Sequence, residues 1–492
     1  MMKRTLLVSA VSTILLAGCG GGGGSSNQLS TAIETPVDAP DCATGFVCDT
    51  LVVPTNYLND DGSTVEVFYA IHKATDEANR IGTLFVNFGG PGGEAHTTLA
   101  WLVDSGQFDP KIVEQFDLVA LDPRGTGQSA YAKELTQCAT KLATDINACN
   151  AFNTTKAANI STNTLVKDID ALRTHLGEEQ ISFLGYSYGT RVGSVYANTY
   201  PERVRALVLD APMSPDLSNA AEFFKDDAAG YELAARFRLE SDARYQTLKD
   251  ASYYLYQDGV LQLNDGELTL DTALGALYAL RESSSYGYWQ HQKAGAFELL
   301  DNGNTQLLNS LVASTPWWQP QNPADDARAS AMFKAVLCAD ELSPLTNAEV
   351  WAMETDFSTN APVYGPVTFH YNAFMCADWP GVQDPVAPLT DMDVKLQTPI
   401  LIIGGEYDTR TSYVWAEAMA QSFASLTRFI RVENVVEHGF SYRGSDCIDD
   451  ATTAYLLDPA AAQDFLTCDG GLMKRSRTGG FKPHPVQQNP RR

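Results

Sequence analysis

Basic residues are scarce in this sequence. Its 492 residues include 34 Lys and Arg but 60 Asp and Glu, which gives a net charge of −26. Six of the basic residues lie in 470–492, a segment without acidic residues, so the rest of the chain carries −32. A body this acidic repels nucleic acids and anionic lipid headgroups and favours neutral or cationic partners. The basic tail 470–492 is rich in Gly and Pro, and we expect it to be disordered.

The N-terminus lacks an apolar run long enough for a permanent transmembrane helix. The run Leu6–Leu16 follows Lys3 and Arg4, the pattern of a secretory signal, and is too short to span a bilayer. We therefore expect the protein to be exported.

The signal ends in Leu-Ala-Gly-Cys at residues 16–19, which resembles a bacterial lipobox. That resemblance implies that the signal peptide 1–18 is removed, that Cys19 becomes the lipidated first residue, and that residues 19–40 form a flexible tether. Gly20 after the cysteine resembles the outer-membrane address of Gram-negative lipoproteins. An ordinary cleaved signal with an incidental cysteine is the alternative.

Zinc-site motifs are absent as well. No two cysteines have the spacing Cys-x-x-Cys, and no cysteine has a histidine at ligand spacing, so we expect no metal or other cofactor. Nine cysteines become eight when Cys19 is set aside, and an even number in an exported protein indicates disulfides. Of the many possible connectivities we predict the sequential pairs Cys42–Cys48, Cys138–Cys149, Cys338–Cys376 and Cys447–Cys468.

Short apolar runs that end near Gly or Asp alternate with helical patterns over much of the chain. The runs are Thr83–Phe88, Phe116–Leu121, Ile181–Leu184, Val204–Leu209, Pro399–Ile403 and Arg428–Val432. Continuous Val, Ile, Leu and Phe runs of this kind are typical of a parallel sheet covered by helices on both faces. The spacing of apolar residues over Asn163–Leu176 predicts one of those helices. The sequence therefore predicts an α/β fold.

The alternation stops between residues 213 and 394. Amphipathic helices are predicted there over Ala220–Ala243 and Leu268–Arg281, and the stretch is rich in Tyr and Trp. We interpret it as a helical cap inserted between the two parts of the sheet domain, residues 41–212 and 395–469. Most of its aromatic side chains should pack inside the cap, and a minority should line a substrate pocket.

A Gly-Tyr-Ser-Tyr-Gly sequence at residues 185–189 lies between the strand ending at Leu184 and a helical pattern over Thr190–Asn198. A nucleophilic serine needs such a sharp strand-to-helix turn, so that its hydroxyl projects from the sheet edge near a helix N-terminus. Glycines flank the serine because a side chain would collide at the turn. This context predicts Ser187 as a catalytic nucleophile.

Residues 87–93, Asn-Phe-Gly-Gly-Pro-Gly-Gly, follow an earlier predicted strand. A tetrahedral intermediate needs two backbone N–H donors directed at its oxyanion, and glycine lets the chain approach closely enough. We assign these donors to the amides of Gly90 and Tyr188. A phosphate-binding loop is the rival interpretation, but Pro91 removes a donor and no Lys-Ser or Lys-Thr pair follows.

Asp408 and His438 each follow a predicted strand in the second part of the sheet domain. A base that accepts the serine proton needs a carboxylate to fix its tautomer, and both must lie at the same sheet edge as the serine. The chain order Ser, Asp, His meets this requirement in open α/β sheets. We assign His438 as the base and Asp408 as the acid that orients it. His96 is the rival base, and Glu406 and Glu437 are the rival acids.

Three motifs occur in order: Gly-Gly-Pro-Gly-Gly at 89–93, Asp-Pro-Arg-Gly-Thr-Gly-Gln-Ser at 122–129 and Gly-Tyr-Ser-Tyr-Gly-Thr at 185–190. Together they resemble the prolyl aminopeptidase and tripeptidyl aminopeptidase branch of the α/β hydrolases, over about residues 40–470. The Cys-Ala-Asp sequences at 338–340 and 376–378 resemble its tripeptidyl members. The resemblance implies an α/β-hydrolase fold and a secreted serine exopeptidase that releases short units from free peptide N-termini.

In that family, acidic cap residues bind the terminal ammonium of the substrate. Asp340, Glu341 and Asp378 flank the predicted Cys338–Cys376 disulfide, which would hold them over the site, and they are the candidates here. Solvated surface acids are the alternative. The sequence departs from the family pattern at Phe88, Glu94, Ser412 and Glu437. These departures spare the nucleophile, base and acid and therefore concern the substrate.

Two other functions are compatible with the same residues. A triad of this kind also attacks esters, so a carboxylesterase or lipase is the alternative enzyme, because a fold does not determine its substrate. A non-catalytic surface lipoprotein that retained the fold is the third possibility. The intact Ser, Asp and His set argues against it.

Overall fold

The computed structural model describes residues 42–59, 61–258, 260–263, 266–269, 297–298, 301–304 and 323–473. The predicted lipidation site Cys19 and its tether lie outside these residues, as does the basic tail after residue 473. Within the described ranges, no helix combines the length and the apolar character needed to cross a bilayer.

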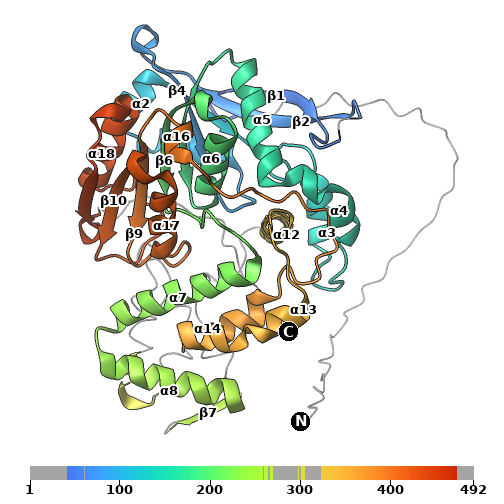
Figure 1. The fold of residues 1–492 in the computed structure, drawn as a ribbon, viewed down its shortest axis with the longest axis vertical. Coiled ribbons are helices and arrows are strands. Elements are labelled where there is room, and N and C mark those ends of the chain that lie inside the picture. The colour runs from blue at the N-terminus through green and yellow to red at the C-terminus, as the bar shows by residue number, and fades with distance from the viewer. Residues whose placement is uncertain are drawn as a thin grey trace, which may run out of the picture. The chain divides into compact units, whose positions relative to one another are not determined.

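Nine of the described strands form one sheet (Figure 1). In spatial order they are β1 (Val47–Pro54), β2 (Thr64–His72), β4 (Phe116–Leu121), β3 (Gly82–Asn87), β5 (Ile181–Tyr186), β6 (Val204–Asp210), β9 (Ile400–Gly405), β10 (Thr427–Glu433) and β11 (Phe465–Asp469). Strand β2 is antiparallel to both neighbours, and every pair from β4 to β11 is parallel. This is the mostly parallel α/β sheet that the sequence predicts.

All six predicted strands are present, but β1, β2 and β11 were not predicted. Strands β1 and β11 lie at the two edges of the sheet. Exposed side chains recur along both, including Val52 and Phe465 at 60% and 58% exposure. A half-exposed edge strand does not have the continuous apolar run of an interior parallel strand. Continuous apolar runs in the sequence therefore do not predict these two edge strands.

Successive side chains of the interior strands point to opposite faces and form two core layers. Phe85 and Ile402 belong to one layer, and Leu84 and Leu401 belong to the other. The first layer is covered by α5 (Thr162–His175), α6 (Tyr188–Thr199) and α17 (Tyr413–Phe423). The second layer is covered by α1 (Ala95–Asp104), α2 (Pro110–Gln115) and α18 (Asp446–Leu457). The sheet is therefore buried on both faces, as its apolar strands require.

Shorter elements complete the sheet domain. Helices α3 (Ala132–Ala139) and α4 (Asn150–Lys156) contribute side chains to the first core layer. Short 3-10 helices connect the longer elements: η1 (Glu77–Asn79), η2 (Ala157–Ile160), η3 (Pro201–Arg203), η6 (Ala424–Leu426), η7 (Pro459–Ala461) and η8 (Gly470–Leu472). The last of these shows that the first residues of the predicted disordered tail are folded.

Residues 213–394, which we call the cap segment, lie between β6 and β9 in the chain. The helices described in it are α7 (Ala220–Leu239), α8 (Asp242–Asp258), α12 (Pro323–Ala339), α13 (Asn347–Ala352), α14 (Glu354–Asn360), α15 (Gly365–Thr368), the π-helical η5 (Phe369–Ala373) and α16 (Met392–Lys395). Helices α7, α8 and α14 lie together away from the sheet (Figure 1). Helices α7 and α8 share a core with the residues that follow α14. This core includes Tyr231, Tyr245 and Tyr364, so many cap aromatics are internal, as expected.

Two predicted cap helices differ from the structure. The single helix predicted over Ala220–Ala243 is divided, because Glu240 adopts a left-handed conformation with a φ of 58° and ends α7. The helix predicted over Leu268–Arg281 is wrong at its start, where β8 (Gly266–Thr269) pairs antiparallel with β7 (Val260–Leu263). The sequence Asn-Asp-Gly at 264–266 is rich in turn-forming residues, which the prediction from helical spacing did not take into account. Residues 270–281 lie outside the described ranges.

The structure forms four disulfides in the sequential pattern predicted above, Cys42–Cys48, Cys138–Cys149, Cys338–Cys376 and Cys447–Cys468. Their Cα–Cα distances of 5.0 to 5.9 Å lie within the usual range. Because reducing compartments keep thiols free, four disulfides in one chain indicate an extracytoplasmic protein.

Candidate active site

Ser187 occupies the tight turn between β5 and α6. Its φ of 57° and ψ of −124° are unfavourable for a residue with a side chain. The Ser187 N–H donates a 3.0 Å hydrogen bond to the backbone carbonyl of Asp210, which fixes the turn to the neighbouring strand β6. A Cβ at Gly185 would lie 2.3 Å from the Gly189 carbonyl oxygen, and one at Gly189 would lie 2.4 Å from the Asn87 carbonyl oxygen. The spacing Gly-x-Ser-x-Gly is therefore a steric requirement of this turn.

The glycine loop after β3 packs against the same turn through its backbone. A Cβ at Gly89 would lie 2.5 Å from the Tyr186 carbonyl oxygen and 3.0 Å from the Cβ of Ser187. Gly89 and the next residue, Gly90, have φ values of 82° and 108°, which favour glycine. The two residues predicted to supply oxyanion donors, Gly90 and Tyr188, line one pocket together with Ser187.

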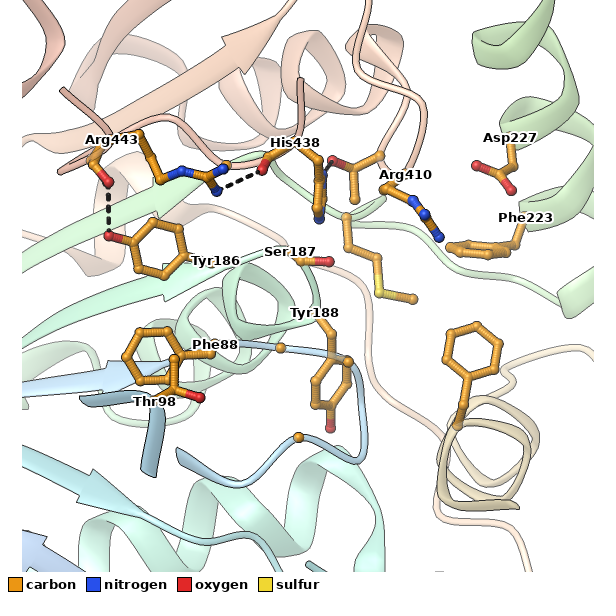
Figure 2. A pocket seen from close by; sticks show the side chains of 18 of the residues that line it. Phe88, Thr98, Tyr186, Ser187, Tyr188, Phe223, Asp227, Arg410, His438 and Arg443 are labelled. Atoms are coloured by element: carbon orange, nitrogen blue, oxygen red, sulfur yellow. Dashed lines mark hydrogen bonds between the residues drawn. The ribbon is translucent and has the colours of Figure 1, made fainter. Parts of the chain in front are cut away.

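His438 and Asp408 are in direct contact. The Nδ1 atom of His438 lies 3.0 and 2.9 Å from the two carboxylate oxygens of Asp408. The buried carboxylate also accepts hydrogen bonds from the backbone N–H groups of Arg410 and Thr411, at 2.8 and 3.0 Å. The hydroxyl of Thr411 lies 3.0 Å from the same carboxylate. With Nδ1 held by Asp408, the other ring nitrogen is directed into the pocket, where the imidazole faces Ser187 (Figure 2).

The rival residues have other partners. The Nδ1 atom of buried His96 lies 2.7 Å from the carboxylate of Asp122. Glu406 pairs with Arg431 at 3.3 Å. Glu437 accepts a 3.1 Å hydrogen bond from the backbone N–H of His438 and lies 3.7 Å from Arg443. Asp408 is therefore the acid in contact with the imidazole.

The pocket over Ser187 has mostly apolar walls (Figure 2). The sheet domain contributes the serine, the imidazole and the glycine loop, and the cap segment contributes Met213, Phe223, Phe224, Tyr231 and Phe333. Four charged side chains also line it, namely Glu94, Asp227, Arg410 and Arg443. In the part of the chain that the structure describes, no group of three or more His, Cys, Asp or Glu side chains could hold a metal ion.

The two pocket acids were not among the predicted site residues. Asp227 lies on α7 with a 4% exposed side chain and accepts a hydrogen bond from the hydroxyl of Tyr231. Glu94 precedes α1 and lies 3.5 Å from Arg328 of α12. The sequence contains a feature that could have indicated each of these acids as a pocket residue. Asp227 is an acid midway between Phe223 and Tyr231 on one helical face, and Glu94 directly follows the glycine loop.

Asp340 was predicted to bind a substrate amine, and the structure corrects this. Its buried carboxylate accepts hydrogen bonds from the N–H and hydroxyl of Thr162, at 3.0 and 2.5 Å, and lies 3.3 Å from Nε of Arg191. Burial raises the pKa of Asp340, and the nearby Arg191 charge opposes that effect. Asp340 therefore joins the end of α12 to α5 and α6 inside the protein.

The other two predicted amine-binding acids also lie away from the site. Glu341 is buried and accepts a 2.6 Å hydrogen bond from the N–H of Ala220, and burial raises its pKa to about 7. Asp378 accepts a hydrogen bond from the side-chain amide of Asn347. Neither these two nor Asp340 is among the described residues that line the pocket. Helix α12 reaches the pocket with Phe333, and the acids after Cys338 lie beyond that contact.

Known proteins resemble this chain along most of its length. The alpha/beta hydrolase fold family matches residues 86–435, which include Ser187 and Asp408. The serine protease Hip1 of Mycobacterium tuberculosis is 28% identical over 463 residues, covering 84% of this chain and 85% of that protein. The tripeptidyl aminopeptidase of Streptomyces lividans is 26% identical over 480 residues, covering 89% and 87%. Carboxylesterase B of Mycobacterium tuberculosis is 27% identical over 468 residues, covering 86% of each.

These relatives include peptidases and a carboxylesterase at similar distances. They therefore support hydrolysis without selecting the substrate. The family match covers well over half of the chain. Together with the strand order and the serine turn, it shows that the chain belongs to the α/β hydrolase fold family and is a serine hydrolase.

Proposed function

We propose that the protein is a serine exopeptidase that releases short units from the free N-terminus of peptides. The observation that carries this proposal is a pocket that contains Ser187 and His438 beside two carboxylates, Glu94 and Asp227, within mostly apolar walls. An ammonium group that leaves water for such a pocket needs an acceptor of opposite charge. The relatives that are a serine protease and a tripeptidyl aminopeptidase support the same substrate class.

The proposed reaction proceeds through an acyl-enzyme. The hydroxyl of Ser187 attacks the peptide carbonyl while His438 takes its proton, and the protonated imidazole then donates that proton to the leaving amine. Asp408 holds the imidazole and stabilises its positive charge. The amides of Gly90 and Tyr188 donate to the oxyanion of each tetrahedral intermediate. Water then attacks the acyl-enzyme by the same route and releases the N-terminal unit.

Asp227 and Glu94 replace the acids near Cys338 as candidates for the substrate amine. Asp227 comes from the cap helix α7 and Glu94 from the end of the glycine loop, so the two carboxylates belong to different parts of the protein. A charge-assisted hydrogen bond to a buried group contributes about 1.5 to 3 kcal/mol. Such a bond would favour a free amine over a blocked one by about 10- to 100-fold.

A carboxylesterase is the second candidate. The aromatic side chains of Phe223, Phe224 and Phe333 could surround an apolar acyl group, and one relative carries the name carboxylesterase B. In that reaction the two pocket carboxylates would have no charged partner on the substrate. Dependence on a free amine therefore separates the two functions.

We also propose that the protein is exported and anchored to the cell envelope through lipid on Cys19. The four disulfides support an oxidising compartment. The lipobox-like sequence at 16–19 supports the anchor.

Replacing the proposed nucleophile, Ser187→Ala, should lower kcat by about 10⁴- to 10⁶-fold and abolish labelling by a fluorophosphonate probe. The matched control Ser194→Ala changes a buried serine two turns later on α6 and should keep the labelling.

Wild-type activity should fall on acidification, because a protonated imidazole cannot accept the serine proton. Labelling that survives in the Ser187 variant, or a flat rate profile between about pH 5 and 8, would contradict the assignment.

N-acetylation of a peptide substrate should lower kcat/KM by at least about 10-fold, because the acetylated end has no charge to pair with a carboxylate. Asp227→Asn and Glu94→Gln, made separately, identify the partner, since only its loss should remove the preference for the free amine. Glu222→Gln is the matched control, because Glu222 lies on the same helix α7 but pairs with Lys225. If wild-type enzyme cleaves free and acetylated peptides equally well, the exopeptidase proposal fails and the esterase takes its place.

The mature protein should carry acyl chains on Cys19 and have no free thiol. Intact mass after alkylation under denaturing, non-reducing conditions measures both properties at once. Cys19→Ala should lose the acyl mass and still show no alkylation. Two or more alkylated cysteines in the wild type would refute the four-disulfide arrangement, and an unacylated N-terminus would refute the anchor.

A further inference from the structure

A buried carboxylate at the end of β6 has no role in the mechanism described so far. The side chain of Asp210 is fully buried and is not among the described residues that line the pocket. Its carboxylate accepts hydrogen bonds from the N–H of Phe440, at 3.0 Å to each oxygen, and from the N–H and hydroxyl of Ser441, both at 2.6 Å. These residues come two and three positions after His438.

Asp210 also contacts the nucleophile turn. Its backbone carbonyl accepts the 3.0 Å hydrogen bond from the N–H of Ser187. Tyr186, the residue before the serine, donates its hydroxyl to the Ser441 carbonyl at 3.2 Å. One residue of β6 therefore links the turn that carries the proposed nucleophile to the loop that carries the proposed base.

A second carboxylate holds the same loop farther along. Asp449 of α18 accepts hydrogen bonds from the N–H groups of Tyr442 and Gly444, at 2.6 and 3.0 Å. Burial raises the pKa of Asp449 to about 6, despite these donors. Asp210 and Asp449 thus anchor residues 440–444 from two elements, but Asp210 is the one bonded closest in sequence to the histidine.

The hydrogen bonds around Asp210 favour its ionised form. The two backbone N–H groups that contact it can only donate, and the Ser441 hydroxyl donates to it as well, so an ionised carboxylate accepts all three hydrogen bonds. Burial raises the pKa of Asp210, while the donors and the charge on His438 lower it. Asp210 and a positively charged His438 are therefore close enough to attract each other.

We propose that Asp210 is a positioning residue for His438 that also stabilises the imidazolium formed when the serine loses its proton. The proposal rests on the proposed role of His438 as the base. Charged and titratable groups from several elements line the pocket with the histidine or contact its loop. They are Asp408 and Arg410 from the loop after β9, Glu437 and Arg443 from its own loop, Tyr186 from β5, Tyr188 from α6, Asp227 and Tyr231 from α7, Glu94 from the end of the glycine loop, Asp449 from α18 and Asp210 from β6. Among these, Asp408 orients the ring directly, and Asp210 acts through the backbone beyond it.

Asp210→Asn tests this role, because the variant keeps the shape of the side chain and removes its charge. The amide NH₂ would face backbone donors, so the loop should shift and kcat should fall by about 10- to 100-fold with little change in KM. The imidazolium loses a negative neighbour, so the acidic limb of the kcat/KM profile should move to lower pH by about half a unit or more. A purely structural role would not move that limb.

Asp449→Asn is the matched control, since it also removes a partly buried carboxylate that holds the loop. It should leave the acidic limb in place. The rate of fluorophosphonate labelling tests the proposed nucleophile Ser187 separately from the proposed role of Asp210. Wild-type enzyme that is not labelled at Ser187 would overturn the proposed function itself. If the wild type is labelled and Asp210→Asn has the same kcat and the same pH profile, the role of Asp210 alone is overturned. The same conclusion follows if the variant loses kcat only because its Tm is lower.

Ser441→Ala keeps the proposal testable if the Asp210 variant does not fold. The hydroxyl of Ser441 is one of the donors that lower the pKa of Asp210, so its loss favours the neutral acid and weakens the stabilisation of the imidazolium. The acidic limb should then move to lower pH, in the same direction as for Asp210→Asn but by less. An unchanged limb, or one that moves to higher pH, would overturn the proposal.

Discussion

The backbone conformation of Ser187 is the constraint on which the rest of the site depends. A positive φ at a residue with a side chain persists only where the surroundings hold it. Here the hydrogen bond to Asp210 and the close contacts at Gly185 and Gly189 do so. Those contacts require the glycine loop, the serine turn and β6 to meet at the carboxyl edge of the sheet. The same edge receives Asp408 and His438, because β9 and β10 run parallel to β5.

The cap segment is packed against the part of the sheet domain that carries the orienting acid. Phe237 of α7 stacks on Tyr407, the residue before Asp408, with ring centroids 4.1 Å apart. The indole N–H of Trp415 donates a 3.0 Å hydrogen bond to Asp226, also on α7. The helix that presents Asp227 to the pocket is therefore fixed to the loop that orients His438. One packed interface therefore positions both Asp227 and Asp408.

Much of this arrangement could be predicted from the sequence, because a buried strand and a tight turn each require particular residue types at neighbouring positions. Doubly buried strands such as β5 and β9 read as continuous apolar runs, and the serine turn requires glycines at fixed spacing. The polar partners of the site could not be predicted in the same way. Asp340 looked like a pocket acid but is buried against Arg191, whereas Asp227 looked like an ordinary helix residue and lines the pocket. Their roles depend on which face of a helix meets the sheet domain, and that is decided by tertiary packing.

We expect Ser187 to become acylated by the N-terminal part of a peptide with a free amine. Rapid acid quenching during turnover of such a peptide, followed by intact-mass and fragment analysis, measures this most directly. We expect a transient adduct on Ser187 whose mass corresponds to the acyl form of the released N-terminal unit, with its amine unmodified. Product formation without any adduct, an adduct on another residue, or acylation by simple esters only would contradict it.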